Sequence, residues 1–575
     1  FTLATDISQI KLITTASSIK YSKFGKIEDW LRNVDPLFGI VKYEKPPHPF
    51  EGRMVQSHYQ LFNTLQLSYE DMESILKPSL DYISAIRKDP AVLRYEIKYP
   101  FDDEKEWGAL ESKNEIIFKL LGINDKFAQT KMYYDFRDDL IKGELRNLKR
   151  GHVLINGNYS TLMGNGIEML KEAIGTFDGK STLNPREIHS TRFPYGTELL
   201  CSRSPHICAG NVMLVNNAAN KLFDEYFNLT PEIVCINAVN YNIQQRLNGC
   251  DYDSDTMLIT DHPLLIERAR QHYAEFKVPT NLTVSIKTHR TYCNEDRADL
   301  DVKTSVNKIG EIVNLAQNLT SLMWERINSG ASIESCMELY FDICKLAVLS
   351  NVEIDRAKKE FIISSSAEIN ILKRKYRITD DERTVKPWFF KMITTENGFT
   401  LSDKVKYRYF KTSMDYLQKI VSKFHFREGR EKKKNVLPFM SLVKQPTGTI
   451  QHSYYYAQKE RIINTIRLSK DETKKIYAGY EQMSSAEREQ ARTQAWDIKQ
   501  NCIEEIVKMS STPSTMYLVL RELDSDENRD VARFVFEILF ARPDKAFFTM
   551  IRESKETIYT LQEVANGDIE YHGYT

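Results

Sequence analysis

The sequence predicts a mixed α+β protein in which a β-rich module lies between largely helical regions. Short β-rich runs separated by Gly, Asn, Pro and Asp gather between about residues 151 and 290, as in a compact β structure. On both sides of this region apolar residues recur three or four positions apart, which is typical of amphipathic helices. The length of 575 residues suits roughly three or four domains.

Composition excludes several classes of protein. The chain has 79 Lys and Arg, 79 Asp and Glu, and 42% hydrophobic residues, which argues against disordered and collagen-like chains. No run approaches the ~18 apolar residues of a membrane helix, and residues 1–10 lack the features of a signal peptide. We therefore expect no membrane partner. Because the chain begins at Phe1 inside a patterned segment, we expect an N-terminal part to be missing.

The cysteines indicate a reducing, cytoplasmic location. None belongs to a CxxC pair, which argues against a zinc knuckle or a redox dithiol. They are spread through apolar stretches such as EIVCINA, where a cysteine behaves as a small buried hydrophobic residue. The eight lie at positions 201, 208, 235, 250, 293, 336, 344 and 502.

Four regions are predicted along the chain. Residues 1–150 form a helical or linker region, and residues 151–300 form the β module. Residues 301–435 are helical and contain a basic, aromatic stretch, and residues 436–575 form a C-terminal helical domain.

Local periodicity predicts the elements within these regions. The β module is assigned the runs HVLIN, TELLCS, GNVMLVN, EIVCINAV, TMLIT and LTVSI, with a helical insert near Ile167–Ile174. Helices are predicted over residues 58–88, 113–122, Lys303–Ile327, Glu338–Ser350 and Asp530–Ala541.

Charge is concentrated in one segment although it sums to zero. Ile371–Lys434 contains 18 Lys and Arg against 8 Asp and Glu. Such a segment can follow a nucleic-acid backbone and stack bases; a solvated helix face is an equal alternative. Its interleaved aromatic residues are Tyr376, Trp388, Phe389, Phe390, Tyr407, Tyr409 and Phe410.

An aspartate cluster is the sharpest motif. In NGCDYDSDTMLIT, the residues Asp251, Asp253 and Asp255 alternate just before a β-like run. In an extended strand the outer two would lie ~13 Å apart, so convergence of all three requires a curled loop. Asn248 and Gly249 permit such a turn.

Convergence would create a site for a hard cation. Carboxylates within ~5.5 Å repel one another by about 3 kcal/mol per pair at an effective dielectric of 20, and a divalent cation removes that penalty. Oxygen ligands favour Mg²⁺ or Mn²⁺. Such an ion, bound by a few carboxylates, keeps coordination positions for water and substrate phosphates, which suits phosphoryl or nucleotidyl transfer. The alternative is an acidic surface turn that binds nothing.

Other motifs are excluded or weak. An EF-hand loop beginning at Asp251 would need Gly at its sixth and Glu at its twelfth position, where Thr256 and His262 stand. No Walker A, GxGxxG, GxSxG or HExxH sequence occurs. A metal-dependent nucleotide-sugar transferase, which uses an Asp-x-Asp motif, stays open.

The motifs resemble those of the two-barrel RNA polymerases, whose catalytic double-psi β-barrel carries a DxDGD loop that binds Mg²⁺. CSRSPHICAGNVMLV is similar to the Arg-x-Pro strand and the Gly-containing strand that follows it, and NGCDYDSDTMLIT to the metal loop and its strand. KLAVLSNVEIDRAKK looks like the helix after the barrel in silencing-type polymerases. The likeness is nearest to single-chain members, the phage-type polymerases and the silencing RNA-dependent RNA polymerases.

This resemblance implies a double-psi β-barrel over residues 151–300 and a template-directed RNA polymerase. The three aspartates would then hold the metal. Arg203 would approach the ribose of the incoming nucleotide or the RNA 3′ end, with a structural salt bridge as the alternative. His206 becomes a candidate substrate contact, with a buried barrel histidine as the alternative.

A first barrel upstream is also implied, because it supplies lysines to the transition-state phosphate in this family. QIKLITTASSIKYSKFG resembles its closing stretch, which makes Lys20 and Lys23 candidate substrate-binding residues. An upstream polypeptide could carry the rest of that barrel. The alternative interpretation is that Lys20 and Lys23 are lysines on an exposed β edge, where lysine is common.

Two positions depart from the family pattern. Ser254 replaces the glycine between the second and third aspartates. Gly249, two residues before the first aspartate, stands where the multisubunit enzymes have an Asn, so the sugar discrimination by that Asn is not implied for this chain. Neither change removes a metal ligand.

The predicted activity is Mg²⁺-dependent synthesis of RNA from nucleoside triphosphates, with a DNA template favoured over an RNA template. A catalytically inactive nucleic-acid-binding scaffold and a nucleotide-sugar transferase are the alternatives.

Overall fold

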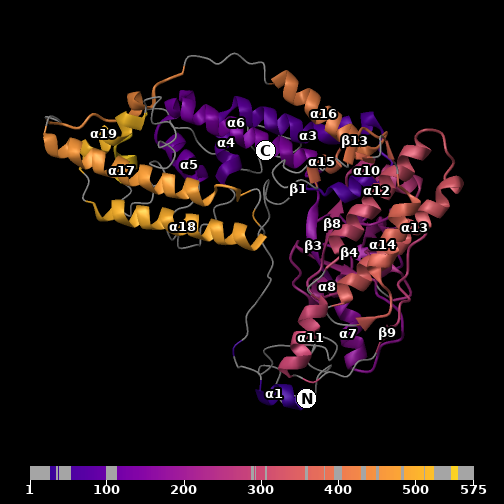
Figure 1. The fold of residues 1–575 in the computed structure, drawn as a ribbon. Coiled ribbons are helices and arrows are strands. Elements are labelled where there is room, and N and C mark those ends of the chain that lie inside the picture. Colours follow the sequence, from indigo (N-terminus) through magenta and orange to yellow (C-terminus); the bar gives the residue numbers. More distant parts are fainter. Residues whose placement is uncertain are drawn as a thin grey trace. The chain divides into compact units, whose positions relative to one another are not determined.

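The described residues of this computed structural model form two compact units (Figure 1). Unit 1 comprises residues 1–79 and 146–426, and unit 2 comprises residues 80–145 and 427–575. The structure describes residues 26–33, 37, 54–98, 113–237, 239–286, 291, 293–304, 307–356, 360–377, 379–380, 383–393, 405–428, 436–448, 452–480, 483, 485–509, 512–523 and 546–554.

A closed six-stranded β-barrel forms the centre of unit 1. β3 pairs in parallel with β7 and antiparallel with β8, and β4 pairs in parallel with β6. The remaining pairs, β4–β7, β5–β6 and β5–β8, are antiparallel. In order around the barrel the strands are β3 (Asn158–Met163), β7 (Ile233–Ile236), β4 (Glu187–His189), β6 (Met213–Asn217), β5 (Glu198–Ser202) and β8 (Thr256–Thr260).

The barrel interior is filled by side chains that alternate along its strands. Leu199 and Cys201 of β5, and Met257 and Ile259 of β8, belong to one buried cluster. Alternate residues of a strand point to the same face, so this pattern places them inside. The outer face of β5 is also buried, at Leu200, because helix α10 (Pro263–Gln271) contacts β5 and β6.

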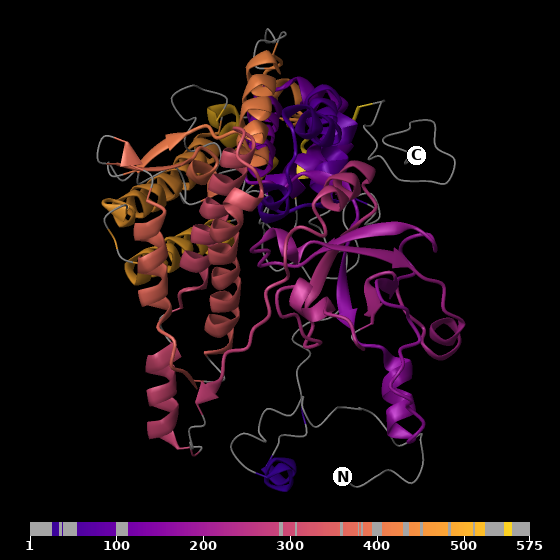
Figure 2. The same ribbon diagram turned by 90° about the vertical axis from the view of Figure 1, so that its right-hand side faces the viewer.

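Two long helices pack beside the barrel (Figure 2). α12 (Ile309–Ile327) contacts α13 (Met337–Asp355), and their apolar faces enclose a core that includes Ile207 and Cys208 from the segment after β5. Periodic apolar residues form these faces. The helices therefore support the chain between β5 and β6 from outside the barrel.

A buried polar network links α12 to α2 (Tyr59–Thr64) and to the barrel. The Asn63 amide donates to Oε1 of Gln317 at 2.9 Å and accepts from the Ser321 hydroxyl at 2.9 Å. Gln317 in turn donates to the carbonyl of His206 at 2.7 Å. Because the side chains of Asn63, Gln317 and Ser321 are hydrogen-bonded to one another and to His206, the network fixes the segment that follows β5.

The basic, aromatic stretch folds around one buried aspartate. Asp415, in α16 (Ser413–Glu428), accepts hydrogen bonds from the backbone N–H groups of Trp388, Phe389 and Phe410 at 2.6–3.1 Å. Burial raises the pKa of Asp415 to about 7. These bonds bring Trp388 against Tyr409, whose rings stack at 5.0 Å between centroids. Beside them, β11 (Thr379–Asp380), β12 (Arg383–Pro387) and β13 (Val405–Arg408) form a small sheet.

The regular elements of unit 2 within its described residues are helices, and two isolated β-bridges, Thr130–Leu437 and Val443–Ile551, connect its loops. α17 (Ser453–Ile476) packs against both α18 (Ser485–Lys508) and α19 (Pro513–Leu523). The other elements are α4 (Pro90–Lys98), α5 (Lys113–Ile123), η5 (Asp125–Gln129), η9 (Phe439–Leu442) and α21 (Ala546–Thr549), while α3 (Tyr69–Lys88) and α6 (Lys131–Lys149) are divided between the units.

The remaining elements of unit 1 are short. They are α1 (Ile27–Asn33), β1 (Met54–Gln56), β2 (Leu154–Asn156), α7 (Gly166–Ala173), η6 (Ala209–Asn211), α8 (Lys221–Tyr226), α9 (Ile243–Arg246), β9 (Ser285–Ile286), α11 (Asn294–Thr304), η7 (Glu334–Cys336), β10 (Glu360–Phe361), α14 (Ser365–Lys375) and α15 (Phe390–Ile393). No helix of the described chain combines the length and apolarity required to cross a membrane.

The mixed class, with a barrel beside helices, is confirmed, and several predicted elements need correction. HVLIN and LTVSI form strands outside the barrel, where β2 pairs with β1 and β9 with β10. The helix predicted over Lys303–Ile327 begins at Ile309. The sequence prediction missed β3 and β4, whose polar residues hide the apolar pattern. Asp530–Ala541 lies outside the described residues.

Candidate metal centre

The loop between α9 and β8 turns sharply before the aspartates. Asn248 and Gly249 have positive φ angles of 53° and 72°, and the Gly249 N–H donates to the carbonyl of Gln244 at 2.8 Å. A Cβ at Gly249 would lie 2.9 Å from Oδ1 of Asn351. The backbone conformation therefore favours glycine here, and a larger residue would also require the Asn351 side chain of α13 to shift.

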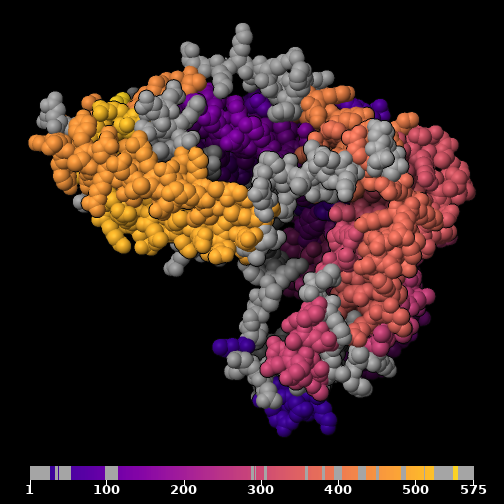
Figure 3. Space-filling model, viewed as in Figure 1, coloured from indigo at the N-terminus to yellow at the C-terminus, as the bar shows by residue number. Residues whose placement is uncertain are grey.

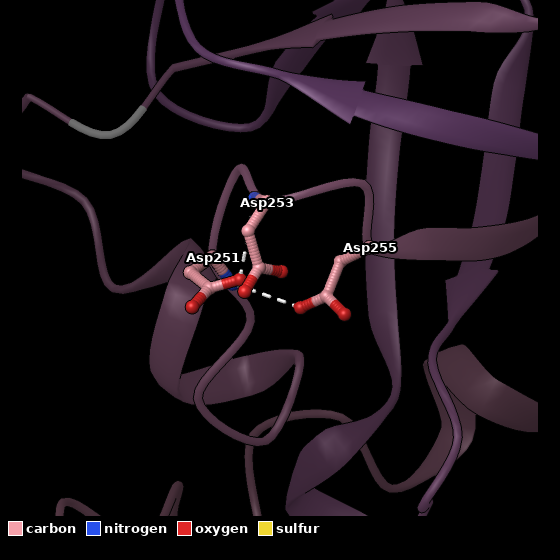
Figure 4. A group of neighbouring side chains, drawn as sticks. All are labelled: Asp251, Asp253 and Asp255. Carbon is pink, nitrogen blue, oxygen red and sulfur yellow. Dashed lines mark hydrogen bonds between the residues drawn. The ribbon is translucent and has the colours of Figure 1, made fainter. Parts of the chain in front are cut away.

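Asp251, Asp253 and Asp255 converge on this loop (Figure 4). One carboxylate oxygen from each lies within 4.8 Å of the others. The curl is held by the Asp251 N–H, which donates to Oδ2 of Asp255 at 2.9 Å, and by the Asp253 N–H, which donates to Oδ1 of Asp251 at 3.4 Å. Asp251 and Asp253 are exposed and Asp255 is half-buried, so the cluster opens to solvent.

The three carboxylates fit a hard divalent cation. Oxygen ligands at ~2.1 Å from an octahedral ion lie ~3 to ~4 Å from one another, so small side-chain rotations would bring these oxygens from within 4.8 Å to coordination distance. Without an ion, each pair repels by about 3 kcal/mol at an effective dielectric of 20 and by less than about 1 kcal/mol in water. Because the cluster is partly exposed, water reduces the repulsion enough for the three carboxylates to stay together without an ion. The remaining repulsion still favours the binding of a cation.

The thiol within the loop does not add a soft ligand. Cys250 is buried in the barrel cluster, and burial raises its pKa to about 12. Among the described residues, the side chains whose ligand atoms converge are the three aspartates, and Cys250 is not one of them. The loop offers oxygen ligands, which hard ions such as Mg²⁺ and Mn²⁺ prefer.

Arg203 connects the two ends of the loop. Its Nη2 lies 2.8 Å from Oδ2 of Asp255, and its Nη1 donates to the carbonyls of Leu247 and Asn248 at 3.2 and 3.1 Å. Antiparallel pairing of β5 with β8 places Arg203, directly after β5, beside Asp255, directly before β8. The planar guanidinium can make all three contacts at once.

Ser254 occupies a strained backbone position. Its φ angle is 87°, in the left-handed region that residues with a Cβ rarely adopt. The polymerase loop that this motif resembles has glycine at this position, and glycine adopts such a φ angle without steric cost. The cost for a non-glycine residue is of order 1 kcal/mol.

His206 is buried, and its Nε2 has no hydrogen-bond partner among the described residues. Its Nδ1 lies 2.6 Å from the Ser202 hydroxyl, and its backbone N–H donates to Oε1 of Gln60 at 2.8 Å. Burial, together with nearby His58, lowers its pKa to about 3, so the ring is neutral at physiological pH. The observed contacts place His206 in the packing beside α2 and α12.

The sequence predicts a role for Asn248 only in the turn. In the structure, Asn248 also attaches the aspartate loop to the segment after β5 and to α13. Its side-chain amide is buried and donates to the carbonyl of Pro205 at 2.9 Å and to the Ser350 hydroxyl at 3.4 Å. Asn351 donates to Oδ1 of Asn248 at 3.5 Å. Ser350 and Asn351 lie in the helix motif KLAVLSNVEIDRAKK, which was a signal for this link. Lys20 and Lys23 lie outside the described residues.

Comparisons with known proteins find distant likeness among solved structures alone. No protein-family model and no curated protein sequence matches the chain. Among solved structures, it is similar to the RNA dependent RNA polymerase QDE-1 from Thielavia terrestris, with 12% identity and a TM-score of 0.46. The alignment covers 86% of this chain and 55% of that chain, so the chain spans just over half the length of the polymerase. The residues of the candidate metal centre, rather than this likeness, therefore indicate what the chain can do.

Proposed function

We propose that the chain is a nucleotidyltransferase that uses Mg²⁺ or Mn²⁺ to synthesise RNA from nucleoside triphosphates on a nucleic-acid template. The proposal rests on the convergence of Asp251, Asp253 and Asp255, with one oxygen of each within 4.8 Å of the others, on a loop that leads into a barrel strand. Such carboxylate sites leave coordination positions of a hard ion to water and phosphate oxygens.

Each residue of the site has a proposed role. The three aspartates hold the ion through one oxygen each. When bound, the ion lowers the pKa of the attacking 3′ hydroxyl and neutralises the leaving pyrophosphate. Arg203 positions Asp255, and its Nε–H, which makes no hydrogen bond to the described residues, is available to the ribose or the RNA 3′ end.

The barrel is proposed to be of the double-psi type. In support, the two motifs that resemble this barrel lie on paired strands, CSRSPHICAGNVMLV on β5 and β6 and NGCDYDSDTMLIT on β8 and the loop before it. Lysines of a first barrel would complete the site, and Lys20 and Lys23 remain the candidates. The likeness to phage-type polymerases favours DNA as the template.

An extension assay tests the activity. The chain is incubated with labelled nucleoside triphosphates, Mg²⁺ and a primed DNA or RNA template, and we expect labelled RNA that disappears in Asp253→Asn. Asp178→Asn, which removes a carboxylate from an exposed loop, is the matched control. Template binding without extension would contradict the proposal and favour the non-catalytic scaffold. Thermal stabilisation by a UDP-sugar but by no nucleoside triphosphate would favour the transferase.

Metal binding is tested separately by calorimetric titration with Mn²⁺. We expect one site in the wild-type chain and in Asp178→Asn, and its loss in Asp253→Asn. Since this measurement needs neither template nor substrate, it distinguishes an absent metal site from a metal site that lacks an upstream partner. Equal Mn²⁺ binding by the wild type and Asp253→Asn would overturn the assignment of the ligands.

A further inference from the structure

A cavity of about 630 Å³ lies in unit 1 away from the aspartate loop. Its walls come from α12, α14 and the strands β12 and β13, and none of its lining residues belongs to the barrel. α12 contacts both α14 and β12, so the walls are fixed against one another. In Figure 3 the residues of α14 are seen at the surface of unit 1. Ligand sites of proteins commonly have ~300 to ~1,000 Å³.

Positive charge exceeds negative charge on the described lining. Lys373, Arg377 and Lys386 line the cavity, and Glu311 is the single carboxylate there. Glu311 is already shared, since it pairs with Lys373 and lies 3.3 Å from the ammonium of Lys308.

The other two cations have no counter-ion among the described residues. Arg377 lies exposed at the rim. Lys386 is half-buried, and its ammonium faces the Phe390 ring at 5.7 Å from the centroid. Burial, with a smaller effect of Lys373, lowers the pKa of Lys386. A charged group held in this way gains from an anion that enters the cavity.

Neutral polar groups lie on the α12 wall of the same cavity. Asn314 and Asn318 are four residues apart and so lie one above the other on the helix. Oδ1 of Asn318 is buried and has no hydrogen-bond partner in the described part of the chain. Buried polar atoms are nearly always paired, so an unpaired one facing a cavity indicates a missing donor. Leucine and valine side chains form most of the remaining lining.

We propose that this cavity binds a nucleoside phosphate. Arg377 and Lys386 would hold the phosphate groups, because a guanidinium and an ammonium are the ordinary ligands of phosphate oxygens. Asn314 and Asn318 would meet the donors and acceptors of a base edge or of the ribose hydroxyls. The apolar lining would cover the faces of the base. This binding site is separate from the aspartate cluster and does not depend on the proposed polymerase activity.

Calorimetric titration with ADP and with GDP in EDTA tests this site. Chelation removes any nucleotide binding that requires a metal at the aspartates. We expect saturable binding of at least one nucleotide to the wild-type chain, unchanged in Asp253→Asn. The double variant Arg377→Gln/Lys386→Gln should bind at least about tenfold more weakly, since two charge-assisted contacts are lost.

Matched variants separate this site from a general effect of charge. Arg374→Gln removes an exposed arginine of the same helix α14 that does not line the cavity, and it should bind as the wild type does. Asn318→Asp keeps the side-chain volume but adds a negative charge to the wall, and it should weaken binding while circular dichroism and the melting temperature confirm folding.

Three results would overturn the proposal. They are no binding of either nucleotide, equal weakening by Arg374→Gln, and unchanged binding by the double variant. Equal affinity for inorganic pyrophosphate would contradict recognition of the nucleoside part.

Discussion

The guanidinium of Arg203 lies 2.8 Å from Oδ2 of Asp255 and also holds the carbonyls of Leu247 and Asn248. One side chain therefore fixes the beginning and the end of the aspartate loop and neutralises one of its three carboxylates. Arg203 is mostly buried and Asp255 is partly buried, so water screens this pair less than it screens an ion pair at the surface.

Arg203→Gln should destabilise the chain. The change removes the positive charge among three carboxylates and leaves two loop carbonyls without their donor, and we expect the free energy of unfolding to fall by about 1 to about 3 kcal/mol. Urea denaturation measures this. Arg270→Gln is the matched control, because it breaks an exposed pair with Glu198 that contributes at most about 1 kcal/mol. Equal effects of the two changes would show that Arg203 does not organise the loop.

Ser254→Gly should leave the aspartates in place and relieve the backbone. Glycine adopts a φ of 87° without steric cost, although it also gains entropy in the unfolded chain, so we expect a net stabilisation of up to about 1 kcal/mol. Ser254→Ala separates the backbone effect from the loss of the hydroxyl. Urea denaturation measures both variants. If Ser254→Ala is more stable than Ser254→Gly, the backbone is not strained at this position.

The stacked pair Trp388 and Tyr409 should contribute to binding of single-stranded nucleic acid. Lys391 lies over the Trp388 ring at 5.0 Å and Lys419 over the Tyr409 ring at 4.9 Å, so aromatic faces and positive charge lie together, as on surfaces that bind bases and phosphates. Trp388→Leu should weaken binding of a labelled oligonucleotide by about fivefold to about a hundredfold, measured by fluorescence anisotropy.

Tyr454→Leu is the control for this surface, because Tyr454 is exposed on α17 of unit 2. It should bind the oligonucleotide as the wild-type chain does. If Trp388→Leu binds the oligonucleotide as the wild-type chain does, or if Tyr454→Leu weakens binding equally, the basic segment is a solvated surface without a specific role in binding.

Buried histidines should make unit 1 sensitive to acid. Burial lowers the pKa of His206 to about 3 and that of His58 to about 4. The unfolded chain, whose histidines titrate near about 6.5, then binds more protons than the folded chain. The free energy of unfolding should therefore fall as the pH drops from about 6.5 towards about 4.

Comparison of variants isolates this contribution. In urea denaturation between pH 7 and pH 5, His206→Gln should show a smaller loss of stability than the wild type, while exposed His452→Gln should follow the wild type. Asp415 has a raised pKa of about 7 and so contributes with the opposite sign, but it does so equally in all three proteins. An unchanged slope in His206→Gln would contradict a neutral, buried His206.

The sequence by itself determined features that depend on neighbouring residues. The alternation of Asp251, Asp253 and Asp255, the turn at Asn248 and Gly249, and the strand that follows are local patterns, because loop curvature and strand periodicity arise within a few residues. The same holds for two helices. The side chain of Asn165 caps the start of α7, and regularly spaced apolar residues mark α13, so each helix is signalled by residues of its own segment. For this reason the carboxylates could be named without coordinates.

Only the tertiary structure decided which distant segments meet. HVLIN has the pattern of a barrel strand, yet it pairs with Met54–Gln56 outside the barrel, because a strand pattern does not specify its partner. Arg203 reaches Asp255 through the pairing of β5 with β8, and Trp388 reaches Tyr409 through the hydrogen bonds of Asp415. Such contacts depend on long-range packing that closes large loops, and local sequence carries no record of it.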